Sequence, residues 1–269
     1  SFSLYALTLT WLLGFVRSGS RAVRWLVSGA GWVIALVSAI EVGLIALQAA
    51  RGVRSHFNFA TELDQTIYSV MGVSIMVLFI ANLLLVAVLA FTRFESRSFG
   101  WALRLGLLVT LVGMAEGFLM TVPTAEQLAA GQRGIAMTVI GAHTVGAPDG
   151  GPGMPGTGWS TTSGDLRVGH FVGMHALQVL PFLGWFLWRR RDLVEKGRVR
   201  LIFVGACSYL AVTLLLTWQA LRGQPLLAPD ALTLASFAAL LAAASGGALW
   251  AWRSGSGTGL AARVSAPQR

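Results

Sequence analysis

The chain has a single cysteine and a single lysine, and each scarcity excludes a class of chemistry. Cys207 lies in an apolar run, so the sequence offers no intramolecular disulfide, no CxxC redox pair and no thiolate metal cluster. Lys196 lies between apolar runs, so there is no intramembrane lysine like that of a rhodopsin. P-loop and G-x-S-x-G motifs are also lacking. Whether the protein is an enzyme does not follow from any motif.

Charged residues are scarce as well. They make up 12% of the 269 residues, whereas about a quarter is usual in soluble domains, and the mean hydropathy is +0.69. This composition predicts a polytopic membrane protein whose main partner is the lipid bilayer. The net charge of +9 resides in short clusters between apolar runs, which argues against nucleic acid as a partner. A small-molecule ligand or other membrane subunits are the further partners that we consider.

Seven apolar segments stand out, and most approach the roughly 20 residues that a helix needs to cross a bilayer. They cover residues 1–16, 25–50, 65–91, 101–122, 168–188, 201–221 and 229–252. The sequence therefore predicts an all-α fold: a bundle of about seven transmembrane helices within residues 1–253, followed by a flexible cytoplasmic tail, 254–269. The first segment is short, and we interpret it as a span rather than a signal-like segment.

Basic residues predict the orientation, because cytoplasmic loops hold an excess of positive charge. Fifteen of the twenty follow segments one, three and five or lie in the tail, and five lie in the other connections: Arg51, Arg54, Arg133, Arg167 and Arg222. We expect the N-terminus outside and the C-terminus inside, in a bacterial cytoplasmic (inner) membrane.

One predicted extracytoplasmic connection, residues 123–167, is much longer than the others. Its middle, GAHTVGAPDGGPGMPGTGWSTTSGD, is rich in glycine and proline, which favour a folded-back backbone with no helix or strand. A flexible linker is one interpretation, but His143, Asp149, Trp159 and Asp165 are unusual in linkers. We favour a lid over the membrane-embedded helices.

The stretch Gly164 to Trp185 turns from a charged loop into an apolar helix that carries His170, His175 and Gln178. Pro181 lacks an N–H group, which frees the carbonyl of Leu177 for a side chain, a water or a ligand. The helix within this stretch is therefore the strongest candidate for a functional helix.

Two acidic residues, Glu41 and Glu116, lie inside apolar segments, where an unpaired charge costs several kcal/mol. From the helical rise, Glu116 and His175 both lie about 10 Å below the outer ends of their helices, and Glu41 lies slightly deeper. We interpret these residues, with Gln48 and Gln178, as one polar layer. The alternative is structural: a buried glutamate stays protonated and a buried histidine is a packing residue.

His170 and His175 are separated by about 140° around a helix, so they do not share a metal ion by themselves. His175 would need a partner from elsewhere, such as Glu116, Glu41 or His56, whereas His170 would face the loop near Asp165 or His143. Asp165 itself is expected to cap the helix. The candidate metal ligands are His175, Glu116, Glu41 and His143.

A candidate cofactor site adds the segment RGVRSHFN, residues 51–58. Arg51 and Arg54 suit a carboxylate, a phosphate or a haem propionate, although contact with lipid headgroups is the simpler role. His56 is the candidate second axial ligand of a haem held by His175, with His170 nearby.

Three hypotheses follow. In the first, an outer-leaflet pocket of histidine and glutamate holds haem or a transition metal ion for redox chemistry, with His175 as main ligand. In the second, Glu41, Glu116 and His175 bind a small ligand or relay protons without a cofactor, in a carrier or sensor. In the third, the protein is an accessory subunit of a membrane complex and its polar layer is structural.

Overall fold

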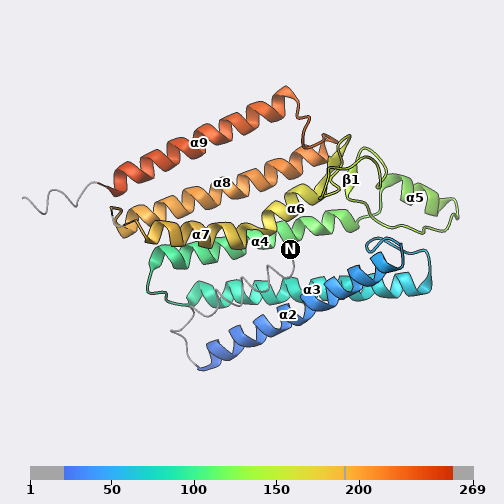
Figure 1. Ribbon diagram of the computed structural model, residues 1–269, viewed down its shortest axis with the longest axis horizontal. Coiled ribbons are helices and arrows are strands. Elements are labelled where there is room, and N and C mark those ends of the chain that lie inside the picture. The colour runs from blue at the N-terminus through green and yellow to red at the C-terminus, as the bar shows by residue number, and fades with distance from the viewer. Residues whose placement is uncertain (1–20, 191, 257–269) are drawn as a thin grey trace, which may run out of the picture.

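The computed structural model describes residues 21–190 and 192–256, and this part of the chain is mostly helical (Figure 1). It contains six helices that are long and apolar enough to cross a membrane, which supports an integral membrane protein. These are α2 (Arg21–Ala50), α3 (Glu62–Phe91), α4 (Arg97–Thr121) extended by α5 (Ala125–Gln132), α6 (Leu166–Met174) with α7 (Ala176–Trp188), α8 (Glu195–Leu221) and α9 (Ala231–Gly255). The first predicted span, residues 1–16, lies outside the described residues, and each of the other six matches one of these helices.

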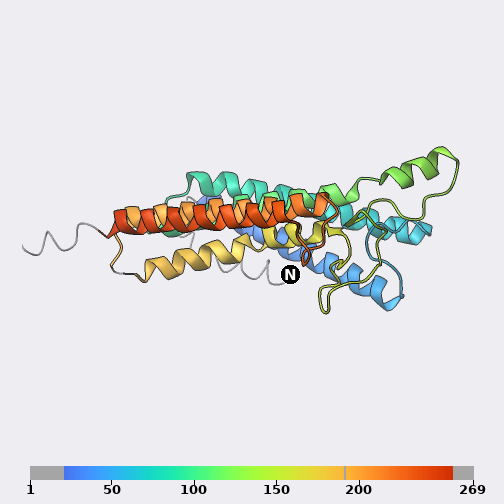
Figure 2. The ribbon, with the colours of Figure 1, turned by 90° about the horizontal axis from the view of Figure 1, so that it is seen from above.

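Helix α4 is the centre of the arrangement. It packs against α6, α7 and α8 on one side and against α3 on the other, while α2 packs on α3 and α9 packs on α8 (Figures 1 and 2). The start of α2 and the end of α9 lie at the same end of the bundle, at the left of Figure 1. Helix α9 reaches Gly255, so the predicted tail that begins at residue 254 overlaps its last turn.

The same end of the bundle holds the predicted basic clusters. The connections α3–α4 and α7–α8 lie there, and several guanidinium groups cover aromatic rings, with Arg189 4.2 Å from the ring centre of Trp185 and Arg200 5.2 Å from that of Trp250. The opposite end, which we call the polar cap end, carries the α2–α3 and α8–α9 connections and the chain between α4 and α6 (Figure 1). Which of the two ends faces the cytoplasm stays a prediction.

Short polar residues begin the helices. Thr61 accepts a hydrogen bond from the N–H of Asp64 at the start of α3, Ser96 accepts one from Phe99 at the start of α4, and Asp230 accepts one from Thr233 at the start of α9. Each cap satisfies a backbone donor that the first helical turn leaves without a partner.

The span between residues 166 and 188 is broken at His175, six residues before Pro181. The Tyr209 hydroxyl on α8 donates to the carbonyl of Val172 at 2.6 Å, and Thr110 on α4 donates to that of Met174 at 3.3 Å. Pro181 was expected to free the carbonyl of Leu177. Side chains of neighbouring helices instead bind carbonyls at the end of α6, which is how a helix break is tolerated in a membrane.

Glycines allow α4 to approach this broken helix closely. A Cβ atom on Gly113 would lie 2.5 Å from the carbonyl carbon of Gly173, and one on Gly106 would lie 3.2 Å from the carbonyl oxygen of Ala176. Small residues at such crossings are typical of membrane helices, which associate by close backbone packing.

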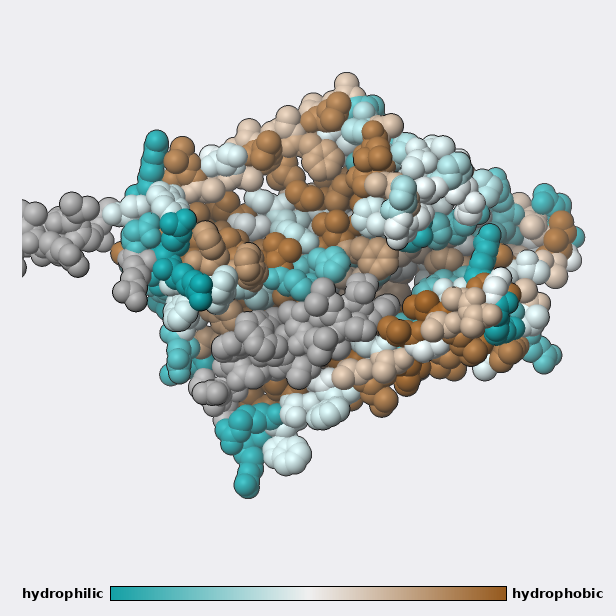
Figure 3. Space-filling model, viewed as in Figure 1, coloured by the Kyte–Doolittle hydropathy of each residue, from teal (hydrophilic) through white to brown (hydrophobic). Residues whose placement is uncertain are grey.

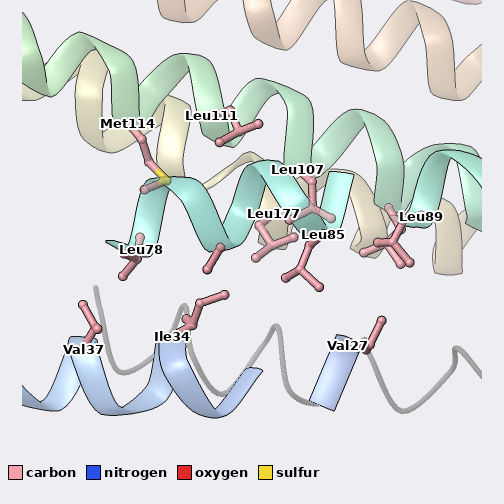
Figure 4. Packing of buried hydrophobic residues seen from close by; sticks show 12 residues of the cluster. Val27, Ile34, Val37, Leu78, Leu85, Leu89, Leu107, Leu111, Met114 and Leu177 are labelled. Atoms are coloured by element: carbon pink, nitrogen blue, oxygen red, sulfur yellow. The ribbon is translucent and has the colours of Figure 1, made fainter. Parts of the chain in front are cut away.

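The apolar core lies where α2, α3, α4 and α7 meet. It contains Ile34 from α2, Leu85 from α3, Leu107 from α4 and Leu177 from α7, all nearly fully buried (Figure 4). Large apolar side chains also cover the outer flanks of the bundle, whereas hydrophilic residues gather at its two ends (Figure 3). A bilayer would contact these apolar flanks.

The connection between α4 and α6 is more regular than the sequence suggested. It holds α5 and two short antiparallel strands, β1 (Thr144–Val145) and β2 (Gly164–Asp165), with Thr144 opposite Asp165. The prediction of no strand in the glycine-rich middle was therefore wrong. The strands form because the chain folds back on itself and pairs segments about twenty residues apart. No local sequence pattern predicts this pairing.

Residues 133–163, which we call the lid, contact two other connections at the polar cap end. The N–H of Phe59 donates to the carbonyl of Thr138, and that of Ile140 donates to Phe57. Gly141 has a φ of 101°, and a Cβ atom there would lie 2.5 Å from the carbonyl oxygen of Met120, so only glycine fits.

Candidate functional site

Glu41 and His56 form the closest pairing among the predicted site residues. Glu41 is fully buried on α2, and its Oε1 lies 3.7 Å from Nε2 of His56 in the α2–α3 connection. Neither oxygen of Glu41 has a hydrogen-bond partner in the described part of the chain. The side chain of His56 is 43% exposed, and its Nδ1 lies 2.9 Å from the Ser55 hydroxyl. A half-exposed titratable group thus contacts a buried carboxyl group.

His56 is held toward its neutral form. Burial lowers its pKa below the usual 6.5, and positive charge on His170 and His143 would lower it further.

Glu116 on α4 is the second buried carboxyl group. A Cβ atom on Gly169 of α6 would lie 3.0 Å from Oε2 of Glu116 and 2.1 Å from the hydroxyl of Thr217 on α8. That hydroxyl donates to the Thr213 carbonyl at 3.1 Å, so neither oxygen of Glu116 has a hydrogen-bond partner among the described residues. Glu116 therefore lies enclosed where α4, α6 and α8 meet.

His170 packs against α4. Its Nδ1 lies 2.7 Å from the carbonyl oxygen of Gly113, and its ring covers Gly117, where a Cβ atom would lie 3.1 Å from the ring. A carbonyl oxygen can only accept, so Nδ1 carries the proton and Nε2 carries a lone pair. His170 was expected to face the loop and meet Asp165 or His143; its hydrogen bond goes to α4 instead.

His175 lies at the break between α6 and α7 and is half-buried. Its Nδ1 lies 3.3 Å from Oε1 of Gln178, which agrees with the predicted proximity of these two residues within one turn. Of the acidic residues that the structure describes, none forms an ion pair with His175. Its proposed partners Glu41 and His56 pair with each other.

Arg51 and Arg54, predicted to act alike, have different surroundings. Nη1 of Arg51 lies 2.6 Å from Oδ1 of Asp64, which also accepts a hydrogen bond from Gln48 at 3.0 Å. Arg51 contacts Gln48 as well, so its charge is used within the α2–α3 hairpin. Arg54 is exposed, and its guanidinium group has neither an ion pair nor a hydrogen bond among the described residues.

His143, a residue of the lid, lies in a cluster of charged residues. Its Nδ1 is 3.4 Å from Asp149 and 3.8 Å from Asp165, which in turn binds Arg167 at 2.7 Å. Burial and the charge of Arg167 lower the pKa of His143. Although burial alone would raise the pKa of Asp165, hydrogen bonds from the Arg167 side chain and the Ser160 N–H lower it.

Asp165 caps α6, as predicted: its side chain accepts a hydrogen bond from the N–H of Arg167. The same carboxylate accepts the N–H of Ser160 at 2.8 Å and so joins the lid to the start of the helix.

No group of three histidine, cysteine or acidic side chains within residues 21–190 and 192–256 is placed to hold a metal ion. The predicted ligands are instead distributed over separate places: Glu41 with His56, Glu116 beside Gly169, His175 with Gln178, and His143 with Asp149 in the lid.

Sequence reasoning missed three residues of these sites. Asp64 is 2% exposed and joins Gln48, Arg51 and Thr61; the spacing T-x-x-D, a helix-cap pattern, could have identified it. Gly169 and Thr217 enclose Glu116 but carry no local signal, because only the crossing of α6 with α8 brings them together.

Comparison of the chain with protein-family models, with curated proteins and with solved structures finds no match.

Proposed function

We propose that the protein binds and exchanges protons at the Glu41–His56 pair, as a membrane carrier or sensor that needs no cofactor. The observation that carries this proposal is the fully buried Glu41 carboxyl group, without a hydrogen-bond partner among the described residues, 3.7 Å from the half-exposed His56. An isolated carboxylate in such a place is costly, so its charge is set by protonation or by a cationic neighbour.

The pair supports a simple proton step. A shift of about 1 Å would bring Nε2 of His56 and Oε1 of Glu41 into hydrogen-bond range. Imidazolium at His56 could then transfer its proton to the Glu41 carboxylate, leaving two neutral groups. Both the start and the end of this step avoid an isolated buried charge, because the imidazolium faces a carboxylate before the transfer.

Ser38 extends the site into the membrane. It precedes Glu41 by one helical turn on α2, and its buried hydroxyl has no hydrogen-bond partner in the described ranges. A hydroxyl group can both accept and donate, so it suits the next position of a proton path.

The test compares Glu41→Gln with Glu126→Gln in proteoliposomes that contain a pH-sensitive dye. Glutamine keeps the size and polarity of the side chain but does not titrate. Glu126 is an exposed residue of α5 at the same end of the bundle and serves as the matched control. We expect Glu41→Gln to abolish proton uptake after an acid jump and Glu126→Gln to leave it unchanged.

Infrared spectroscopy of the same proteins distinguishes a carrier from a sensor. A sensor would show a titrating carboxyl band that Glu41→Gln removes, without net proton flux. If wild type and Glu41→Gln agree in both flux and infrared titration, the proposal is wrong.

A second candidate is the binding of haem or a transition metal ion for redox chemistry. It is favoured by His170, whose Nδ1–H group binds the Gly113 carbonyl and leaves Nε2 with its lone pair, as in many histidine ligands of metals. His175, whose Nδ1 lies 3.3 Å from Gln178, is the candidate ligand of a separate site. An absorption spectrum with elemental analysis of wild type, His170→Ala and His175→Ala decides: a colourless, metal-free wild type purified without chelators would remove this candidate.

We propose that the polar cap end faces outward in a bacterial cytoplasmic membrane. Support comes from the basic residues, since Arg51, Arg54, Arg133, Arg167 and Arg222 are the few at this end and the clusters lie at the other. Glu41 and His56 would then exchange protons with the extracytoplasmic side.

A further inference from the structure

A pocket lies within the lid itself, close to the start of α6 but separate from the Glu41–His56 pair. It has a cavity volume of about 160 Å³, and its lining includes the side chains of His143 and Arg167 and the backbone of Gly150, Gly151 and Gly158. A cavity of this size holds a group of only a few heavy atoms.

The acidic residues around the pocket already have partners. Asp149 accepts the N–H groups of His143 and Thr144 at 3.3 and 2.8 Å. Asp165 accepts hydrogen bonds from the Arg167 side chain and from the N–H of Ser160. Their capacity to repel an added anion is therefore reduced.

Some hydrogen-bond donors that line the pocket have no acceptor in the part of the chain that the structure describes. The Nη1 group of Arg167 and the N–H group of Gly150 donate no hydrogen bond within the described residues. Nη2 of Arg54 lies 3.9 Å from the position that a Cβ atom on Gly150 would occupy, so its guanidinium group is a neighbour of this lining residue, although Arg54 itself does not line the pocket. Unlike Arg51, Arg54 has no carboxylate partner there.

We infer that this pocket binds a small anionic group, a carboxylate or a phosphate, with Arg167 and the Gly150 N–H group in its lining as donors and Arg54, beside Gly150, as the charge without a carboxylate partner that favours an anion there. A planar guanidinium group and converging backbone N–H groups are the donors that proteins use for such anions. The group could belong to a free solute or to a lipid headgroup, and both present the same oxygen atoms. The inference does not depend on proton exchange at Glu41.

The test measures binding of inorganic phosphate and of acetate to the full chain in nanodiscs of phosphatidylcholine, by calorimetry. We expect saturable binding of at least one probe by wild type. Arg54→Ala should weaken it at least about tenfold, which corresponds to about 1.4 kcal/mol, and Arg54→Lys should restore part of it. Arg133→Ala is the matched control, since Arg133 is an exposed arginine at the same end, at the end of α5.

Nanodiscs that contain phosphatidylglycerol distinguish the two sources. If the bound anion is a headgroup, the anionic lipid will compete with phosphate in wild type and not in Arg54→Ala. Equal binding of the probes by wild type and Arg54→Ala would overturn the inference, as would no saturable binding of any anion. Proton uptake should be unchanged in Arg54→Ala, so failure here and failure of the Glu41–His56 proposal are distinguishable.

Discussion

Glu41 and Glu116 are both buried carboxyl groups without a hydrogen-bond partner among the described residues, yet they differ in their access to water. Glu41 contacts His56, whose side chain is 43% exposed. Glu116 is enclosed by Gly169 and Thr217, with no room for one additional methyl group. Glu41 thus has a titratable neighbour that reaches water, so it suits proton exchange better than Glu116.

The surrounding halves of the molecule are also held together differently. In the α2–α3 hairpin, a polar network at the tip joins Gln48, Arg51 and Thr61 to the single carboxylate of Asp64. In the α4–α6–α8 half, the backbones of α4 and α6 approach closely at Gly113 and Gly173, and Gly169 packs against the Thr217 side chain. Charge-assisted hydrogen bonds thus hold the tip of the hairpin, in addition to its apolar core, whereas the other half depends on close backbone packing at glycines.

The largest expected effect comes from Gly169→Val. Its Cβ atom would lie 2.1 Å from the Thr217 hydroxyl and 3.0 Å from Oε2 of Glu116, so either these side chains or α6 itself must shift. We expect a loss of about 3 kcal/mol or more in the free energy of unfolding, measured by SDS denaturation in mixed micelles. Gly72→Val is the control, since a Cβ atom on this glycine of α3 would meet nothing within 4 Å. Equal stability of the two variants would contradict the close packing.

A smaller effect is expected from Asp64→Asn in the hairpin. Asparagine has one acceptor oxygen, so it cannot serve Gln48, Arg51 and Thr61 together, and the charge opposite Arg51 is lost. We expect faster hydrogen exchange at the tip of the hairpin and unchanged exchange in α8. Asn58 to Ala60, next to this network, should report the change first. Uniform acceleration over the whole bundle would show that the two halves are not independent.

The smallest effect is expected from pH. In the folded protein the pKa values of His56 and His143 lie below the usual 6.5. At pH values between these lowered pKa values and 6.5, the unfolded chain therefore binds more protons than the folded one. The free energy of unfolding should therefore fall as the pH decreases through 6.5 toward the lowered values. The decrease should be measurable as a lower melting temperature at pH 5 than at pH 7.5. The double variant His56→Gln and His143→Gln should reduce this difference, and an unchanged difference would assign it to other groups.

Several features could be predicted from single segments. Each apolar run from residue 25 onward corresponds to a helix, because a backbone in hydrocarbon must satisfy its hydrogen bonds internally. Asp165 as a helix cap and the contact of His175 with Gln178 were predictable because the partners lie within one turn. Because charged residues are scarce in the apolar segments, the sequence also identified Glu41 and Glu116 as the acidic residues inside their helices.

Only the tertiary structure decided which residues meet. Glu41 contacts His56 rather than His175 because α2 packs on α3 and the connection folds back over the hairpin. Gly169 encloses Glu116 because three helices cross at one place. Arg51 and Arg54 differ because Arg51 reaches Asp64, whereas Arg54 reaches Gly150 in the lid. Helix formation depends on each segment and its solvent, whereas these contacts depend on helix positions far apart in the chain, which no local pattern encodes.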